Sequence, residues 1–213
     1  MIGAILVSTE PKLFELGGVP CQCIVINPKQ ASTVLKYAET NQMPMVRVKF
    51  QQTIIGREAG RARAVAFYSS RGPSHNSPGA LKPDLMAPGS LILAGWIPND
   101  AVGSIGPSVV LSSEYNMISG TSMACPHVSG VAALLKAAHP EWSPAAIRSA
   151  MMTTAFTFDN TRKPIVENGF KSRIASPLAM GAGQIDPNRA LDTGLIYDAT
   201  PQDYVDYVFH EFH

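Results

Sequence analysis

Short apolar runs separated by polar loops predict most of the strands. The segments 3–7 and 23–26 are continuously apolar, which is typical of buried strands. The segment 45–50 alternates apolar and basic side chains, which predicts a strand with one face buried. Further strands are predicted at 64–68, 91–96 and 115–118, and loops are predicted at 70–89 and around Gly103, Gly106 and Pro107.

Three segments have the pattern of helices. Residues 30–40 place apolar side chains at helical spacing, which predicts a short amphipathic helix. The segment from Ser122 to about residue 138 is apolar on nearly all sides, which predicts a helix buried in the middle of a domain. The next helix is predicted to begin with Ser143 as N-cap and Pro144 in the first helical position, and to end near residue 155. Strands mixed with such helices predict an α/β domain.

Composition and charge narrow the class of protein. The chain has 213 residues, 46% of them apolar, which suits one large domain, or one domain and part of another. Seventeen Lys and Arg against 16 Asp and Glu leave a net charge of +1, which argues against a nucleic-acid partner. The start of the chain lacks the basic segment of a signal peptide, and no apolar stretch reaches the roughly 18 residues of a membrane span. We therefore predict no membrane partner.

The cysteines give only a weak signal. Cys21 and Cys23 form a Cys-x-Cys pair without a second pair, and Cys125 stands alone. Three cysteines are too few for a disulfide framework, and a structural zinc site needs four ligands. We predict ordinary thiols here, and neither a metal nor another cofactor.

Ser122 is the strongest candidate for chemistry. It follows a Gly-Thr turn at the start of the predicted buried helix. The first N–H groups of a helix have no partner within the helix, and this end carries partial positive charge. A carbonyl attacked by the Ser122 hydroxyl would therefore develop its oxyanion beside a free donor. On these local grounds alone, a simple turn or capping residue is the favoured interpretation.

Several motifs in register resemble one family. The segment Gly120-Thr-Ser-Met-Ala124 with Pro126-His-Val-Ser-Gly130 resembles the nucleophile signature of the subtilisin-like serine proteases, the subtilases. The first forty or so residues are similar to the end of the protease-associated insertion of the plant branch. Further similar segments are Ser69–Pro73, Lys82–Gly89, His139–Ala155, Gly181–Gly183, Asp186–Leu191 and Gly194–Asp198. The resemblance implies a remnant of that insertion at 1–42, the C-terminal half of the catalytic domain at 43–195, and the start of a truncated C-terminal region at 196–213.

The resemblance implies both a fold and an activity. The family's catalytic domain is α/β, with a mostly parallel sheet covered by helices on both faces, of which this chain would supply only the later strands. Ser122 would be the catalytic nucleophile of an endopeptidase that cleaves protein or peptide substrates by acyl transfer. The family's aspartate, histidine and oxyanion asparagine precede the insertion, so none is carried over onto this chain. We therefore expect the chain alone to be inactive, its central helix partly uncovered.

No histidine of the chain is predicted to replace the missing base. His127 follows Ser122 by five residues, which places it about 140° around the helix axis, and His139 lies about 25 Å further along. We interpret His127 as a packed, hydrogen-bonded structural residue. His75 lies in a Gly-, Pro- and Ser-rich loop where nothing in the sequence orients it.

Other polar residues have plainer interpretations. Asp84 is predicted to fix a turn rather than to belong to a triad. Cys125, one turn after Ser122, is predicted to be a small buried residue. The C-terminal pair His210 and His213 lacks the spacing of a metalloprotease motif and is interpreted as part of a solvated end.

Two alternative functions stay open at this point. The chain could be an inert truncated paralogue or a fragment that binds partners through its first forty residues. It could also be a non-protease α/β binding domain that carries similar loops. The family resemblance implies secretion of the protein, although the chain starts without a signal peptide. The sequence carries no pattern that indicates an oligomeric state.

Overall fold

The protein is described by a computed structural model that covers residues 4–9, 23–47, 62–105, 109–168 and 173–212. The chain divides into two compact units, and each is described by itself. The first unit contains Met1–Gly60 and Leu91–Ser119. The second unit contains Arg61–Ser90 and Gly120–His213.

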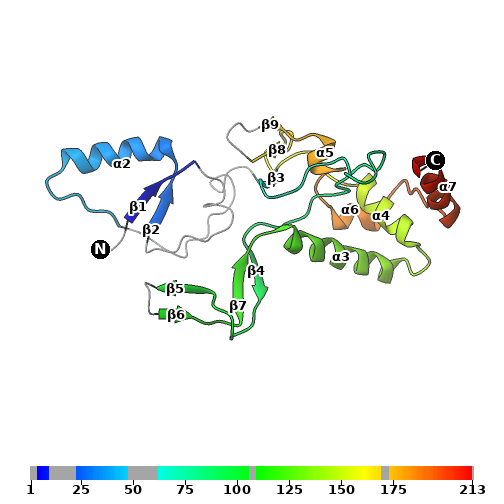
Figure 1. Ribbon diagram of the computed structural model, residues 1–213, viewed down its shortest axis with the longest axis horizontal. Helices are drawn as coiled ribbons and strands as arrows, with labels where there is room; N and C mark the ends of the chain where they lie inside the picture. Colours follow the sequence, from blue (N-terminus) through cyan, green and yellow to red (C-terminus); the bar gives the residue numbers. More distant parts are fainter. Residues whose placement is uncertain (1–3, 10–22, 48–61, 106–108, 169–172, 213) are drawn as a thin grey trace. The chain divides into compact units, whose positions relative to one another are not determined.

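In the first unit, a parallel strand pair precedes a helix (Figure 1). Strand β1 (Ala4–Val7) pairs in register with β2 (Cys23–Ile26), which confirms both strands. Their predicted burial is wrong, because most of β1 is exposed and β2 is only partly buried. Helix α2 (Pro28–Thr40) begins at Asn27, whose side chain accepts the Gln30 N–H while the Gln30 side chain accepts the Asn27 N–H. This reciprocal capping box fixes where the helix starts.

The first unit also contains two antiparallel strand pairs. Strand β4 (Ile92–Gly95) pairs with β7 (Tyr115–Ile118), which confirms both predicted strands. Strand β5 (Gly103–Ile105) pairs with β6 (Val109–Leu111), where the sequence predicted a loop. The sequence did not predict these short strands, because the glycine and proline residues around them are typical of loops. The strand predicted at 45–50 is absent at 45–47, and its remaining residues lie outside the described part.

The second unit contains a small three-stranded sheet. Strand β3 (Ala64–Val65) pairs in parallel with β8 (Val166–Glu167), and β8 pairs antiparallel with β9 (Arg173–Ile174). Helix α5 (Pro177–Met180) follows the sheet. Together they enclose one buried apolar cluster, which consists of Val65, Ile165, Ala175 and Ala179.

Helices make up the rest of the second unit (Figure 1). They are α3 (Thr121–Ala138), α4 (Pro144–Thr153), α6 (Pro187–Leu191) and α7 (Pro201–Phe212). Helices α3, α4 and α6 contact one another around a second buried cluster. Its members are Val131, Leu135, Ile147, Met151, Ile185 and Ala190.

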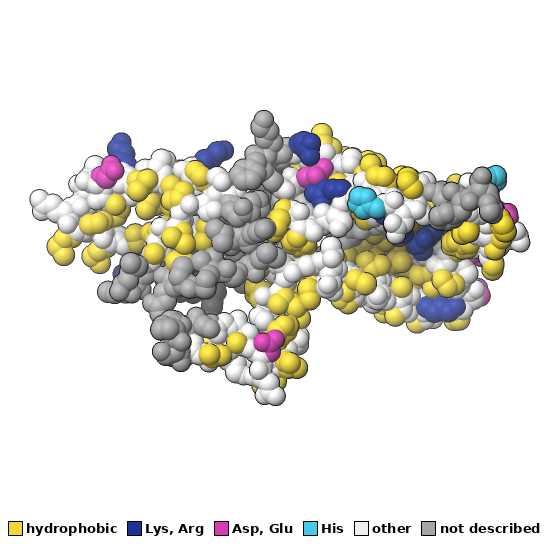
Figure 2. Space-filling model, viewed as in Figure 1, with side chains coloured by type: hydrophobic (Ala, Val, Ile, Leu, Met, Phe, Trp, Pro, Cys, Tyr) yellow, Lys and Arg dark blue, Asp and Glu magenta, His cyan; other side chains and the backbone are white. Residues whose placement is uncertain are grey.

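Helix α3 is much less buried than its composition predicts. Of its 18 residues only Val131 and Leu135 are buried, and the neighbouring Leu134 is 67% exposed. Figure 2 shows hydrophobic side chains gathered at the surface over this helix. The prediction of a fully buried helix is therefore wrong for this chain, because its apolar residues surround the axis but contacts cover only one side.

The structure confirms a protein of mixed helices and strands, but its described strands form four small sheets rather than one. Two pairings are parallel and three are antiparallel.

Cys23 is disulfide-bonded, so its interpretation as an ordinary thiol is wrong, whereas Cys125 is a free thiol. Among the described helices, none has the length and apolar character that a membrane crossing requires.

Candidate functional site

The N-terminus of α3 presents Ser122 with unpaired polar groups around it. Gly120 is the N-cap and has no side chain to accept a hydrogen bond from the helix. The Met123 and Ala124 N–H groups donate to the Gly120 carbonyl at 3.1 and 3.4 Å. Within the described residues, the N–H groups of Thr121 and Ser122 and the exposed Ser122 hydroxyl have no hydrogen-bond partner. This end of the helix can therefore accept a developing anion.

Pro126 removes a further hydrogen bond from the same turn. It lies inside α3, four residues after Ser122. Because proline has no backbone N–H, the Ser122 carbonyl lacks the i→i−4 bond that a regular helix would give it. The Ser122 N–H and the Ser122 carbonyl therefore both lack an i→i−4 hydrogen bond of the helix.

The turn before Ser122 is held by a close backbone contact. The Gly120 N–H donates to the Gly89 carbonyl at 2.8 Å. A Cβ atom on Gly89 would lie 2.8 Å from the Gly120 carbonyl oxygen and 3.3 Å from the Ala124 Cβ. The backbones approach so closely that only glycine fits at position 89 without displacement.

A hollow of about 760 Å³ lies beside this helix end. From α3 it is lined by Ala124, Cys125 and Val128, and from the preceding loops by Tyr68 and Leu85, among others. Most of its lining is aliphatic. The exposed Cys125 thiol lines this hollow, so the prediction that Cys125 is buried is wrong.

The described histidines make contacts unrelated to Ser122. His127 Nδ1 donates to the Met123 carbonyl at 2.7 Å, which confirms a hydrogen-bonded residue, although its side chain is exposed rather than packed. His139 Nε2 donates to the Leu191 carbonyl at 2.9 Å, and its ring stacks on Trp142 with centroids 3.9 Å apart. His139 therefore has a structural contact of its own.

Among the described residues, no hydrogen bond or ion pair joins the remaining candidates to Ser122. His75 is exposed in the loop before β4, and His210 lies on the exposed α7. His213 lies outside the described residues. Asp84 pairs with Lys82 at 2.7 Å, and its carbonyl accepts the Ala182 N–H at 2.9 Å, which is the turn-fixing role expected of it.

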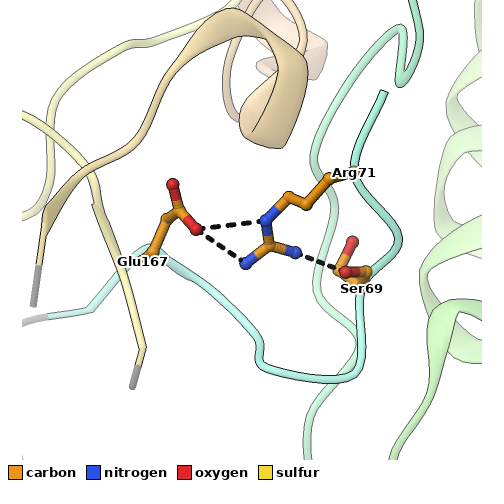
Figure 3. A network of polar contacts seen from close by, with 3 residues as sticks. All are labelled: Ser69, Arg71 and Glu167. Atoms are coloured by element: carbon orange, nitrogen blue, oxygen red, sulfur yellow. Dashed lines mark hydrogen bonds and ion pairs between the residues drawn. The ribbon is translucent and has the colours of Figure 1, made fainter. Parts of the chain in front are cut away.

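The segment that follows β3 is anchored by an ion pair that sequence analysis missed. Arg71 donates through Nε and Nη2 to Glu167 Oε2 at 3.1 and 3.0 Å, and through Nη1 to the Ser69 carbonyl (Figure 3). Glu167 belongs to β8, the strand that pairs with β3. Position 71 falls in one of the family-like motifs, but its partner lies 96 residues away, so no local signal identifies the pair.

Residues 18–183 match the family model described as the subtilase family. The chain belongs to the subtilase family. It is 52% identical to the subtilisin-like protease SBT3 of Solanum lycopersicum over 202 residues, which are 95% of this chain and 26% of that protein. It is 45% identical to the subtilisin-like protease SBT1.6 of Arabidopsis thaliana over 184 residues, which are 86% of this chain and 23% of that protein.

This subtilase chain thus spans about a quarter of the length of the curated relatives it matches. Among solved structures it is similar to fervidolysin from Fervidobacterium pennivorans, a keratinolytic enzyme related to subtilisin. That match has 32% identity and a TM-score of 0.35, and covers 51% of this chain and 15% of fervidolysin. The resemblance to plant subtilases that the motifs suggested is confirmed by the sequence matches.

Proposed function

We propose that this chain carries the nucleophile, Ser122, of a subtilisin-like serine endopeptidase. The observation that supports this most is the exposed, unbonded Ser122 hydroxyl beside free N–H groups, inside the region that matches the family. In this proposal Ser122 Oγ attacks the scissile carbonyl while its proton passes to a general base. The new oxyanion accepts a hydrogen bond from the Ser122 N–H, and the acyl-enzyme forms as the amine leaves.

We propose that the base, the carboxylate that orients it and a second oxyanion donor come from outside this chain. Two observations support this. The described histidines have other partners or no contact with Ser122. The chain also corresponds to only 26% of the relative SBT3, which leaves most of a protease of that length unaccounted for.

The organisation of the whole protease follows from the same proposal. Residues 1–42 would end a protease-associated domain, 43–195 would complete the catalytic domain, and 196–213 would begin a further region. The parallel pairs β1–β2 and β3–β8 support a place in larger, mostly parallel sheets with helices on both faces. Protein or peptide substrates and secretion of the whole protein are part of this proposal, because the matched relatives are plant subtilisin-like proteases.

The decisive experiment replaces Ser122 in the complete protease. Ser122→Ala is expected to abolish hydrolysis of a fluorogenic peptide amide and covalent labelling by a fluorophosphonate, because loss of a triad serine costs several orders of magnitude in rate. Ser129→Ala, an exposed serine further along α3, is the matched control and should keep both activities. Persistent labelling of the Ser122→Ala protein would contradict the proposal.

The alternative, an inert or partner-binding chain, is tested with residues 1–213 alone. A serine without its base is a weak nucleophile, so we expect no acyl-enzyme burst with an activated ester above a Ser122→Ala control. We also expect binding of a hydrophobic dye, because large apolar side chains such as Leu134 and Phe209 are exposed. A Ser122-dependent burst from this chain alone would show that it supplies its own base. If the complete protease is active while residues 1–213 alone are not, the chain is inactive only because it lacks the rest of the protein.

A further inference from the structure

We propose that Tyr68 is a positioning residue for Ser122. Its hydroxyl holds the segment Gly89–Ser90, on which the turn before Ser122 rests. The proposal rests on the proposed role of Ser122 as nucleophile, and it assigns the hydroxyl of Tyr68 an effect on rate rather than on folding.

The first step is the dependence of Ser122 on Gly89. Gly120 provides no side-chain cap for α3, and the backbone bond from the Gly120 N–H to the Gly89 carbonyl, 2.8 Å long, is one of the described hydrogen bonds that tie this turn to its surroundings. A shift of Gly89 would therefore move Gly120, and Ser122 lies only two residues further on.

The second step links Gly89 to Tyr68. The Tyr68 hydroxyl and the Ser90 hydroxyl share a hydrogen bond of 2.7 Å. The Tyr68 oxygen also lies 3.5 Å from the position that a Cβ on Gly89 would occupy. Tyr68 is thus hydrogen-bonded to Ser90, and its hydroxyl lies next to Gly89, whose carbonyl the Gly120 N–H bonds.

The third step is the anchoring of Tyr68 itself. Tyr68 lies in the turn after β3, where the Ser69 N–H donates to the Ala66 carbonyl at 3.2 Å. Arg71 clamps the same turn by bonding the Ser69 carbonyl and Glu167 on β8 (Figure 3). A chain of contacts therefore runs from the small sheet through Tyr68 and Gly89 to the nucleophile turn.

The physical consequence concerns geometry at the reacting atom. A small misplacement of a nucleophile lowers the rate strongly, because the near-attack geometry becomes rarer. The Ser122 turn has no side-chain cap, and Pro126 cannot donate a hydrogen bond to the Ser122 carbonyl. The neighbouring Gly89–Ser90 segment therefore contributes more to the placement of this turn than it would at the start of a capped helix.

The test uses the complete protease with Tyr68→Phe, Ser90→Ala, the double variant and Ser90→Thr. The control is Tyr197→Phe, which removes the hydroxyl of a tyrosine that is 70% exposed. Four quantities are measured: the rate constant of labelling by a fluorophosphonate, kcat and KM for a peptide amide, and Tm. Ser90 is exposed, so Ser90→Ala tests the same hydrogen bond even if Tyr68→Phe folds poorly.

We expect Tyr68→Phe and Ser90→Ala each to lower kcat and the labelling rate about threefold to tenfold, the effect of one hydrogen bond. KM and Tm should stay unchanged, the double variant should lose no more than either single one, and Ser90→Thr and Tyr197→Phe should behave as the wild type. An unchanged labelling rate, additive losses in the double variant, or a fall in Tm alone would overturn the proposal. Labelling that survives Ser122→Ala would instead overturn the proposed function, and this inference with it.

Discussion

Helices α3 and α4 of the second unit follow one another in the chain but are built differently. Half of the ten residues of α4 are buried, against two of 18 in α3. At its N-terminus α4 is capped by Ser143, whose hydroxyl oxygen accepts the Ala146 N–H at 3.0 Å and donates to Asp198. Helix α3 begins at a glycine with no side-chain cap.

The difference separates a helix whose first turn is capped and buried from one whose first N–H groups are left free. A side-chain cap satisfies the free donors of a helix and contributes about 1 kcal/mol. The same cap on α3 would occupy the N–H groups that an oxyanion needs. The first turn of α3 is therefore less stable than a capped turn. Val131 and Leu135, near the other end of the helix, pack it into the buried cluster.

The largest expected effect separates the two faces of α3. Leu135 is 1% exposed and belongs to the buried cluster, whereas Leu134 is 67% exposed. Leu135→Ala should lower the free energy of unfolding of the second unit by about 2–5 kcal/mol, and Leu134→Ala should change it by less than about 0.5 kcal/mol. Urea unfolding is followed by the fluorescence of Trp142 in a Trp96→Phe background, which leaves a single tryptophan in the second unit. Equal losses would mean that contacts cover both faces in solution.

The next effect tests the cap of α4. Ser143→Ala removes the acceptor of the Ala146 N–H and the partner of Asp198, so it should cost about 1–2 kcal/mol by the same measurement. Ser129→Ala in α3 serves as the matched control, because Ser129 is exposed and alanine favours the helix. A loss from Ser129→Ala as large as that from Ser143→Ala would remove the contrast between the helices.

A smaller effect is expected at His127. Its ring bonds the Met123 carbonyl on the exposed side of α3, so His127→Gln should change the free energy of unfolding by less than about 1 kcal/mol. Labelling of Ser122 by a fluorophosphonate in the complete protease should persist. A folded variant with unchanged melting and a lost chemical step would instead identify His127 as catalytic.

The smallest effect concerns the N-terminus of α7, a third example of capping. The Thr200 hydroxyl and N–H both donate to Asp203 Oδ2 at 2.7 Å, and these bonds, the hydroxyl first, lower the pKa of Asp203. The stabilisation that these bonds give to the N-terminus of α7 is therefore present above the ordinary pKa of the carboxyl group. It is lost as the pH falls through the lowered pKa of Asp203. A pH titration of the Thr200 amide by NMR should show this transition.

Asp203→Asn should abolish that transition. Asp206→Asn is the control, because Asp206 accepts from Gln202 rather than from Thr200. If the Thr200 amide titrates alike in the wild type and in Asp203→Asn, the capping contact does not persist in solution.

Local signals in the sequence predicted most of what is local in the fold. The strands β2 and β7 were predicted at their observed bounds because their apolar runs are short and sharply bounded. The start of α4 was predicted because a Ser-Pro pair specifies both the cap and the first helical residue. The uncapped start of α3 follows from Gly120 in the same way.

What the sequence could not predict depends on partners far along the chain. Strand β3 was predicted, as part of a longer strand at 64–68, but its two-residue partner β8 lies about 100 residues away, so no local signal reveals β8 or the pairing. The apolar pattern of α3 alone predicted a buried helix, because periodicity shows which side chains are apolar, not what covers them; only the family resemblance led us to expect partial exposure. The contact between Tyr68 and Ser90 was missed for the same reason, since two hydroxyls in loops carry no pairing signal.

Pro126 has a consequence for how α3 opens in water. Hydrogen exchange reports the free energy of local opening, and an amide without a hydrogen-bond partner exchanges almost as in an unfolded peptide. The Thr121 and Ser122 amides belong to that class, while amides near Leu135 are held by the helix and the buried cluster. Because Pro126 cannot donate to the Ser122 carbonyl, the first turn has one helical hydrogen bond fewer than the turns around Leu135. We therefore expect the segment that carries Ser122 to open in water more readily than the body of the helix.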